Sequence, residues 1–173
     1  SAQGVTGGTF CADAGTEILT RRGWLRYDRV VAGDDCLTLN TGTGLAEWQP
    51  VTSVHVFTDG PYDVIRMEGP SHSSVTTPDH RWPAVTPGTD RIGWYATRTL
   101  PPDAQLCISE SERTDKVADL AATEETADLV WCVQTPNRTW YARRAGTSYF
   151  TGNTILWATV GALTNVVVFN VTV

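Results

Sequence analysis

The feature that most constrains the fold is a succession of short strand-like runs separated by turn signals. The runs are rich in β-branched and aromatic residues, and the clearest turns between them are Arg22-Gly23, the Gly-rich residues 41–44 and Asp59-Gly60-Pro61. The predicted strands are residues 16–20, 36–40, 51–57, 62–67, 73–76, 91–98, 104–109, 130–134, 139–143 and 148–151. Only residues 116–128 have a helical pattern, and that pattern is weak. The sequence therefore predicts an all-β fold.

The length and the charge of the chain exclude several classes of protein. Its 173 residues are enough for one hydrophobic core and few for two. With 13 basic and 19 acidic residues the net charge is −6, which offers no electrostatic footprint for nucleic acid. Residues 1–10 have neither a positively charged start nor an apolar run, so we expect no signal peptide and a cytoplasmic, monomeric protein.

The C-terminal segment, residues 155–173, contains no charged residue. Polar residues interrupt it at Thr159, Thr164, Asn165 and Asn170, and it lacks the ~20 apolar residues that a membrane span needs. We therefore expect this segment to form a buried strand or a surface for a partner, and not a membrane helix.

The cysteines and histidines do not form a recognisable metal site or a disulfide framework. The four cysteines are Cys11, Cys36, Cys107 and Cys132, and the three histidines are His55, His72 and His80. No Cys-x-x-Cys pair occurs, the histidines have no paired ligand spacing, and a chain of this length does not need disulfides to fold. We expect free thiols, no zinc and no cofactor.

Two segments far apart in the sequence carry the most reactive groups. The first, Thr77-Pro78-Asp79-His80-Arg81-Trp82, offers a hydroxyl and an imidazole three positions apart. The second begins with the thiol of Val130-Trp131-Cys132 and ends at Gly152-Asn153-Thr154, where a carboxamide directly precedes a hydroxyl. These groups suffice to break one peptide bond, to cut a second and to join the ends. Alone each is ambiguous, since a buried free cysteine usually behaves as a small hydrophobic residue.

Taken in order along the chain, these segments resemble the sequence blocks of inteins, which are self-splicing proteins. Residues 11–24, which begin with Cys11, resemble the opening block of an intein. Thr77-x-x-His80 resembles the second block, and residues 148–153 resemble the closing block. Each motif is weak alone, but their order along one chain is specific.

One departure from most inteins points to a subclass. The penultimate block of most inteins carries an aspartate where this chain has Cys132. A cysteine at that place, with Trp82 just after the histidine and Thr151 two residues before the terminal asparagine, resembles the Trp-Cys-Thr signature of class 3 inteins.

The resemblance covers residues 11–153 and implies a division of the chain. Residues 1–10 and 154–173 are then flanking host sequence, the N-extein and the C-extein. The interval between Trp82 and Cys132 has no room for a homing endonuclease, so residues 11–153 would be a mini-intein. The implied fold is the Hint fold, a horseshoe of bent antiparallel strands with little helix that brings the two termini together.

The resemblance also implies how the first bond is broken. Cys132 would add to the carbonyl carbon of Phe10 and form a thioester, which leaves Cys11 with a free amine. His80 would protonate the leaving nitrogen, because the pKa of an imidazole is naturally close to neutral. Thr77 would hold the imidazole or the tetrahedral oxygen. The reaction is a single turnover in cis and requires no cofactor or partner.

The remaining steps are implied for the other end. The hydroxyl of Thr154 would take the acyl group from sulfur, and Asn153 would then attack its own carbonyl carbon through its side-chain amide and release the intein as a succinimide. Trp82 would fix the pocket around Cys132, and Thr151 is a candidate for a role near the same site.

The role of Cys11 stays open at this stage. In class 1 inteins the first residue attacks its own upstream carbonyl, whereas class 3 inteins generally do not rely on it. Three roles are therefore possible: Cys11 takes no part in the reaction, or it acts together with Cys132, or the acyl group passes from Cys11 to Cys132 to Thr154. The missing aspartate favours Cys132 as the essential thiol.

Gly152 is a second departure from the family. Most inteins have a histidine before the terminal asparagine to assist cyclisation, and glycine has no side chain to do so. Arg143, Tyr141 or His72 would be the substitutes.

Two other classes of function remain possible from the sequence. A Hint domain of the hedgehog or bacterial intein-like kind forms the same thioester but yields it to water or to an outside nucleophile, without ligation. A non-catalytic β-rich structural or binding module, such as a phage virion domain, is the other alternative.

Overall fold

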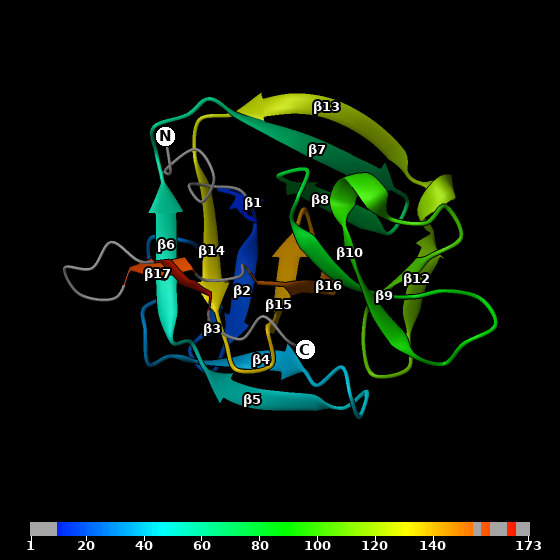
Figure 1. Ribbon diagram of the computed structural model, residues 1–173, viewed down its shortest axis with the longest axis horizontal. Helices are drawn as coiled ribbons and strands as arrows, with labels where there is room; N and C mark the ends of the chain where they lie inside the picture. Colours follow the sequence, from blue (N-terminus) through cyan, green and yellow to red (C-terminus); the bar gives the residue numbers. More distant parts are fainter. Residues whose placement is uncertain (1–9, 154–156, 160–165, 169–173) are drawn as a thin grey trace.

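The computed structural model describes residues 10–153, 157–159 and 166–168, which form short antiparallel strands and the 3₁₀ turns η1 and η2 (Figure 1). Each strand predicted from the sequence overlaps a strand of the structure, so the all-β prediction is confirmed. The elements are β1 (Ala12–Asp13), β2 (Glu17–Thr20), β3 (Gly23–Leu25), β4 (Asp35–Leu39), β5 (Ala46–Pro50), β6 (Ser53–Phe57), β7 (Tyr62–Gly69), β8 (His72–Thr76), β9 (Arg81–Val85), β10 (Ile92–Ala96), η1 (Thr97–Thr99), β11 (Gln105–Cys107), β12 (Arg113–Lys116), η2 (Val117–Asp119), β13 (Ala121–Ala127), β14 (Val130–Gln134), β15 (Thr139–Arg144), β16 (Thr147–Gly152), β17 (Trp157–Thr159) and β18 (Val166–Val168).

One sheet brings together the segments that carry the sequence motifs. Its strand order is β13-β7-β8-β1-β14-β6, and all neighbours are antiparallel. The two-residue strand β1 lies in its interior, between β8 and β14. The start of the predicted intein therefore lies beside the threonine–histidine motif on one side and the Cys132 strand on the other.

Two further sheets complete the framework. One has the order β16-β15-β2-β4-β5 with β3 added to β2, and the other has the order β10-β9-β11-β12. The hairpin predicted at residues 41–44 joins β4 to β5, where Leu39 pairs with Ala46. Strand β16 contacts β9, so the closing block of the predicted intein lies against the strand that follows His80.

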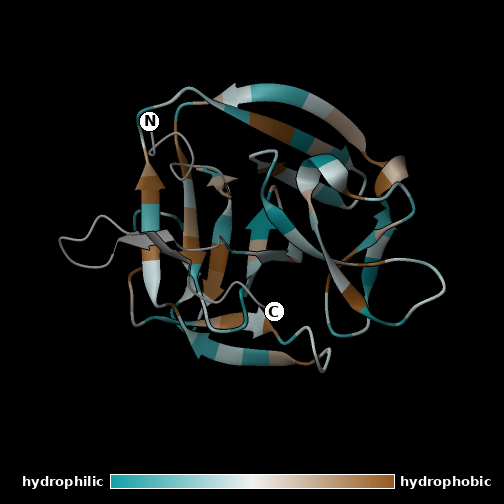
Figure 2. Ribbon diagram, in the orientation of Figure 1, coloured by the Kyte–Doolittle hydropathy of each residue, from teal (hydrophilic) through white to brown (hydrophobic). Residues whose placement is uncertain are grey.

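The helical prediction for residues 116–128 is wrong. This region contains the end of β12, the turn η2 and the strand β13, which pairs with β7 over seven residues. The ladder with β7 supplies the backbone hydrogen bonds that a helix would have made internally, and Arg66 of β7 forms an ion pair with Glu125 of β13. The middle of β13 is teal in Figure 2, the colour of hydrophilic residues, and its side chains are exposed. A polar strand at the edge of a sheet has no apolar periodicity, so its sequence carries no pattern that predicts a strand.

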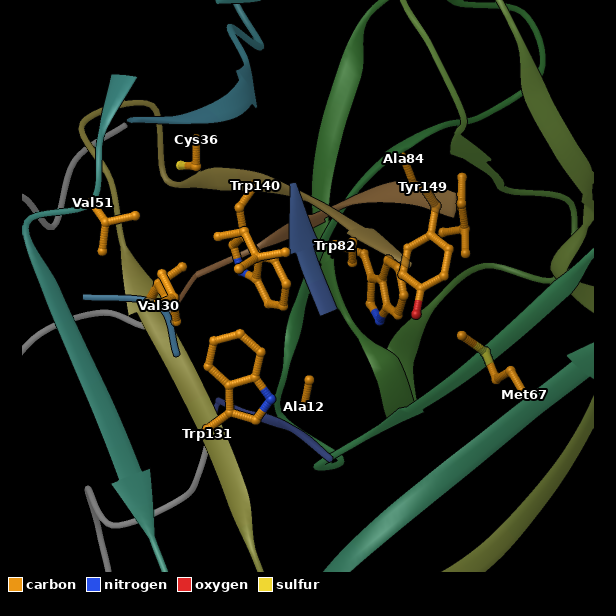
Figure 3. Close-up of a cluster of buried hydrophobic side chains, with 14 of the residues drawn as sticks. Ala12, Val30, Cys36, Val51, Met67, Trp82, Ala84, Trp131, Trp140 and Tyr149 are labelled. Atoms are coloured by element: carbon orange, nitrogen blue, oxygen red, sulfur yellow. The ribbon is translucent and has the colours of Figure 1, made fainter. Parts of the chain in front are cut away.

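Large aromatic side chains fill the interior (Figure 3). The rings of Trp131 and Trp140 lie 5.3 Å apart between centroids, and those of Trp82 and Tyr149 lie 5.4 Å apart. Burial of one such side chain is worth about 1.5–3 kcal/mol. Because these residues come from β14, β15, β9 and β16, the core ties the site-bearing sheet to the other two.

The structure describes two parts of the C-terminal segment, residues 157–159 and 166–168. Its described parts, β17 and β18, pair as an antiparallel hairpin, which agrees with the expectation of strand structure. No helix in the described part of the chain is long and apolar enough to cross a membrane. The predicted N-extein before Phe10 and the residue Thr154 lie outside the described residues.

Candidate active site

The register of the central sheet places four reactive side chains in one row. Ala12 in β1 pairs with β14 on one side and with β8 on the other. The residue before it, Cys11, therefore lies opposite Cys132 in β14 and opposite Thr77 just after β8. The row continues into β6, where His55 pairs with Cys132. Directly opposed side chains project to the same face with Cβ atoms ~4.5–5.5 Å apart, so the sheet gathers a hydroxyl, two thiols and an imidazole.

Thr77 holds the backbone of Cys11 from both sides. The Cys11 amide nitrogen donates a hydrogen bond of 2.9 Å to the Thr77 hydroxyl, and the Thr77 amide nitrogen donates one of 2.9 Å to the Cys11 carbonyl. The Thr77 Oγ1 also lies 3.3 Å from that carbonyl oxygen. The Cys11 nitrogen belongs to the Phe10-Cys11 peptide bond, so Thr77 fixes the orientation of that bond. The Thr77 hydroxyl thus lies on the amide of the predicted scissile bond, and its predicted role of holding the imidazole or the tetrahedral oxygen stays a prediction.

The two thiols of the row are buried and in contact. Cys11 and Cys132 are 1% and 2% exposed, and neither forms a disulfide. The pKa of Cys11 is raised well above its usual value, first by its hydrogen bond with Cys132 and then by burial, which disfavours the thiolate; the backbone of Phe10 acts in the opposite direction. Cys11 is therefore a protonated thiol at neutral pH that interacts with the sulfur of Cys132.

His80 is fully buried near the backbone of Phe10, the predicted first splice junction. Burial lowers its pKa to about 4, and the backbone of Phe10 lies close enough to oppose that shift. Its Nε2 lies 2.5 Å from the hydroxyl of Thr151, while its Nδ1 has no hydrogen-bond partner among the described residues. His80 therefore stands as a neutral imidazole between the Phe10 end of the chain and the closing strand β16.

Trp82 and Thr97 fix the position of His80. The Trp82 ring lies edge-on to the imidazole, with 5.4 Å between centroids, and its Nε1 donates a 2.8 Å hydrogen bond to the Thr97 hydroxyl. The Thr97 amide donates a 2.9 Å bond to the His80 carbonyl, and its hydroxyl also meets Thr76 at 2.8 Å. Trp82 belongs to a different buried cluster from Cys132. Its indole packs against His80, and its predicted role in the pocket around Cys132 stays a prediction.

Asn153 is buried directly after β16, at the predicted second splice junction. Its amide nitrogen donates a 2.9 Å hydrogen bond to the carbonyl of Arg138, and its side-chain Nδ2 donates one of 3.3 Å to the carbonyl of Thr135. Its Oδ1 has no partner among the described residues, although the side chain is only 3% exposed. An unpaired buried amide oxygen costs about 1–3 kcal/mol. The carboxamide is thus held in place through its nitrogen, the atom that would have to attack.

The backbone around Gly152 explains why no histidine precedes Asn153. A Cβ atom at Gly152 would lie 2.4 Å from the carbonyl oxygen of Arg81 and 2.9 Å from the Trp94 ring. Both distances are shorter than any normal carbon contact, so this conformation accepts no side chain at Gly152. The indole of Trp140 donates a 3.0 Å hydrogen bond to the Gly152 carbonyl and holds the strand in this position.

The three expected substitutes for that histidine are engaged elsewhere in the described structure. Arg143 pairs with Glu17 at 2.9 Å, and its guanidinium stacks over Trp24. The other two, Tyr141 and His72, contact Phe150 and Ser74 respectively. None of their described contacts reaches Asn153, which is instead bordered by Thr135 and Arg138.

Sequence reasoning missed four residues that the structure brings to the two junctions. They are His55, Thr97, Thr135 and Arg138. None of them belongs to a recognisable motif, and their partners lie far away in the sequence. Only for His55 was there a usable signal, since residues 51–57 were predicted as a strand and a strand places its side chains on alternate faces.

The described residues contain no group of three or more side chains that would hold a metal ion. The site contains thiols, an imidazole, hydroxyls and a carboxamide. These are the nucleophiles and proton carriers that acyl transfer within one chain requires.

Comparisons with known proteins agree on the fold. No protein-family model and no curated protein matches the chain. Among solved structures, the chain is similar to a glutathione-linked, splice-inactive variant of the AceL NrdHF class 3 split intein, with a TM-score of 0.73 and 17% identity over 84% of this chain and 99% of that chain. It is similar to the DnaB intein of Synechocystis sp. PCC 6803, with a TM-score of 0.66 and 14% identity over 84% and 99% of the two chains. It is also similar to a bacterial intein-like domain from Clostridium thermocellum, with a TM-score of 0.64 and 20% identity over 83% and 99%.

These similarities and the antiparallel sheets establish that the chain has the Hint fold of inteins, as its motifs led us to expect.

Proposed function

We propose that the chain is a self-splicing mini-intein of class 3, residues 11–153, that acts in cis on its own flanks, residues 1–10 and 154–173. The observation that carries this proposal is the contact between Cys132 and Cys11, because it puts a second thiol beside the peptide bond that Thr77 holds. The intein fold supports the same class of reaction.

The first step breaks the Phe10-Cys11 bond. The sulfur of Cys132 adds to the carbonyl carbon of Phe10, the bond to the Cys11 nitrogen breaks, and that nitrogen leaves as an amine. An amide resists attack because resonance holds it planar, but a well-oriented intramolecular nucleophile reaches effective molarities of ~10⁵–10⁸ M. Thr77 supplies the orientation, since it binds both the nitrogen and the carbonyl of Cys11.

The pair of thiols favours Cys132 as the essential nucleophile. The hydrogen bond with Cys132 and burial raise the pKa of Cys11, so Cys11 stays protonated at neutral pH, which leaves Cys132 as the candidate nucleophile. Of the three roles left open by the sequence, this arrangement supports the one in which Cys11 acts together with Cys132.

His80 is the proton donor to the leaving amine. Its pKa of about 4 makes it neutral in the resting protein, so it must first gain a proton as negative charge develops on the neighbouring tetrahedral oxygen. The bond with Thr151 and the packing of Trp82 orient its ring for this task. These two residues thereby act as positioning residues of the Trp-Cys-Thr set.

The second half of the reaction takes place at the other junction. The Thr154 hydroxyl takes the acyl group from Cys132, which gives a branched ester. The side-chain nitrogen of Asn153 then attacks its own carbonyl carbon, forms a succinimide and frees the C-extein, and the ester rearranges to an amide. The hydrogen bonds of Asn153 to Thr135 and Arg138 hold the attacking group.

Cleavage without ligation is the second candidate. It is supported by the similarity to the bacterial intein-like domain and by the lack of a histidine before Asn153. In that case the thioester on Cys132 is released to water, and no joined exteins form.

Mass spectrometry of the purified chain and three variants tests the proposal. Splicing gives residues 1–10 joined to 154–173 together with the free intein, whereas hydrolysis gives separate fragments. We expect Cys132→Ala to abolish cleavage at Phe10-Cys11 and Cys11→Ala to slow it less. Cys107→Ala serves as the matched control, because Cys107 is a fully buried thiol in a different core cluster. Full thioester formation in Cys132→Ala, with none in Cys11→Ala, would rule out the class 3 route.

A further inference from the structure

The first step of the proposed reaction requires a group that takes the thiol proton of Cys132. The described structure offers one residue for this task outside the motifs, and it is the cross-strand neighbour of Cys132. We propose that His55 is the general base that accepts this proton. The inference rests on the proposed splicing function.

The strand pairing of β6 with β14 places His55 on the reactive face of the sheet. The two strands lie side by side in Figure 1, and His55 is directly opposite Cys132. Phe57, two residues further along β6, packs in the same buried cluster as Cys11 and Cys132, and its ring stacks with that of His55. Alternation along a strand puts His55 and Phe57 on one face. The imidazole therefore lies on the face that carries the two thiols.

A chain of hydrogen bonds sets the proton on the far nitrogen of the His55 ring. The hydroxyl of Ser53 donates to the side-chain oxygen Oε1 of Gln134 at 3.2 Å, because that oxygen only accepts. The Ser53 oxygen, 3.1 Å from Nε2 of His55, is then the acceptor, and Nε2 carries the proton. The other nitrogen, Nδ1, is left with a lone pair and is able to accept a proton.

The surroundings of His55 keep the ring in its basic form. Burial lowers its pKa, and no charged side chain contributes to that shift. The titratable groups that face it from the neighbouring strands are Cys132 in β14 and, one strand further, Cys11. The Ser53 hydroxyl shares its own strand, and Gln134 lies opposite that serine. The ring is half-buried, so it exchanges protons with solvent more readily than the enclosed His80.

The proton balance of the step follows from this placement. His80 first takes up one proton from solvent and enters the step as an imidazolium. The S–H proton of Cys132 passes to Nδ1 of His55, and the sulfur forms the bond to the Phe10 carbonyl carbon. The electron pair of the broken amide bond goes to the Cys11 nitrogen, which takes the proton from His80. The imidazolium of His55 keeps its hydrogen bond to Ser53. When the acyl group moves to Thr154, the hydroxyl proton of Thr154 passes to His80, which gave up its proton in the first step, and the sulfur of Cys132 leaves and recovers the proton from His55. Two histidines thus divide the work: His55 as base and His80 as acid.

The pH dependence of branch formation tests the inference. The Asn153→Ala background stops the reaction at the branched chain, whose rate of appearance is measured from pH 5.5 to 9. We expect the rate to rise with pH and to level off once His55 is neutral. In His55→Gln the rate at pH 7 should fall ~10²-fold, the lower end for general acid–base help, and should climb towards the parent rate at pH 9, where the more abundant hydroxide acts as the base in place of the imidazole. Added imidazole should restore part of the loss at pH 7.

Two controls separate a base from a structural residue. Val56→Thr changes the exposed neighbour on the opposite face of the same strand and should leave the rate and its pH profile unchanged. Ser53→Ala frees the tautomer of His55 and should slow the reaction only a few-fold.

A loss in His55→Gln that is equal at all pH values and resists imidazole, or no loss at all, would overturn the role of His55. Failure of the parent chain to form any branched species or thioester would instead overturn the proposed splicing function.

Discussion

The two junctions of the predicted intein differ in the number of reactive side chains that surround them. At the Phe10-Cys11 bond the fold assembles two thiols, Thr77 on the scissile amide and His80 beside the backbone of Phe10. At Asn153 the described neighbours are backbone carbonyls, a threonine hydroxyl and a glycine packed without space for a side chain. No ionisable side chain replaces the missing histidine in the contacts described there.

This difference indicates which step limits the proposed reaction. Groups held in place before the reaction lower the barrier of the first step. Asn153 cyclisation instead depends on position alone as far as the described contacts go: Thr135 holds the carboxamide nitrogen, and Oδ1 has no partner among the described residues. We therefore expect the branched chain to accumulate before the C-extein is released. The bond from His80 to Thr151, two residues before Asn153, is the physical link between the two ends.

The largest expected effect is that of Asn153→Ala, which removes the only group able to form a succinimide. The Asn153-Thr154 bond should survive completely, while the thioester and the transfer to Thr154 continue, since neither uses the carboxamide. A branched species should appear on a denaturing gel, and mild base should split it into residues 1–10 and residues 11–173. With Thr154→Ala added, the trapped acyl group should be a thioester that hydroxylamine releases. Finding only linear, base-stable precursor would remove the distinction between the junctions.

Replacing His80 by Ala should affect mainly the first junction. The variant loses the proton donor to the Cys11 nitrogen, and general acid help is worth ~10²–10⁴-fold. Cleavage at Phe10-Cys11 induced by dithiothreitol should fall by that factor. Thr114→Ala, a buried polar residue in β12 remote from both junctions, controls for loss of stability. Cleavage of His80→Ala at the parent rate would show that the buried imidazole is not the acid.

The next effect, in order of size, concerns Gly152→Ala. The added methyl would meet the Arg81 carbonyl at 2.4 Å, so β16 must move away from β9. A displacement of ~1 Å in the attacking group costs up to ~10²-fold in rate, so release of the C-extein should slow by about that factor. Gly15→Ala is the matched control, since its Cβ would make only ordinary contacts of 3.4 Å or more. Equal rates for both variants would mean that the close packing at Gly152 is not what sets the geometry of Asn153.

The sequence predicted the strands well because their signals are local. β-Branched runs and turn residues lie within a few positions of one another, and the Thr77 to Trp82 motif falls at the end of β8 and the start of β9. The strand β13 was missed because its exposed, polar side chains carry no apolar pattern, and β1 because two residues are too few for a period. The strands β3, β5, β9 and β12 were not predicted either.

The candidate site was predictable only where a motif names its residues. Cys11, His80 and Cys132 were singled out by their order along the chain, and the structure brings them to the same peptide bond. His55 reaches the site through the register of β6 with β14, and Thr97 reaches it through the packing of η1 against Trp82. No local sequence pattern encodes either contact. The requirement for glycine at position 152 could not be predicted from the sequence either, because the backbone that excludes a side chain there belongs to Arg81.

The last expected effect is on stability in acid rather than on rate, and it too separates the junctions. Burial lowers the pKa of both His80 and His72 to about 4, whereas the unfolded value is ~6.5. The unfolded chain therefore binds more protons between these values, so stability is complete above pH ~6.5 and falls as the pH drops towards 4. At pH 5 the loss is roughly 2 kcal/mol for each histidine, before the carboxylates with lowered pKa values, such as Asp34, begin to contribute below pH ~4.

Urea unfolding of the inactive Cys132→Ala chain at pH 7 and pH 5 measures this loss. His80→Gln should remove about half of the difference between the two midpoints, because its side chain does not titrate. The Asn153 junction has no such group among its described contacts, so Asn153→Ala should leave the difference unchanged. A midpoint that is equal at the two pH values would show that the N-terminal junction is not the dry, neutral site inferred from the burial of His80.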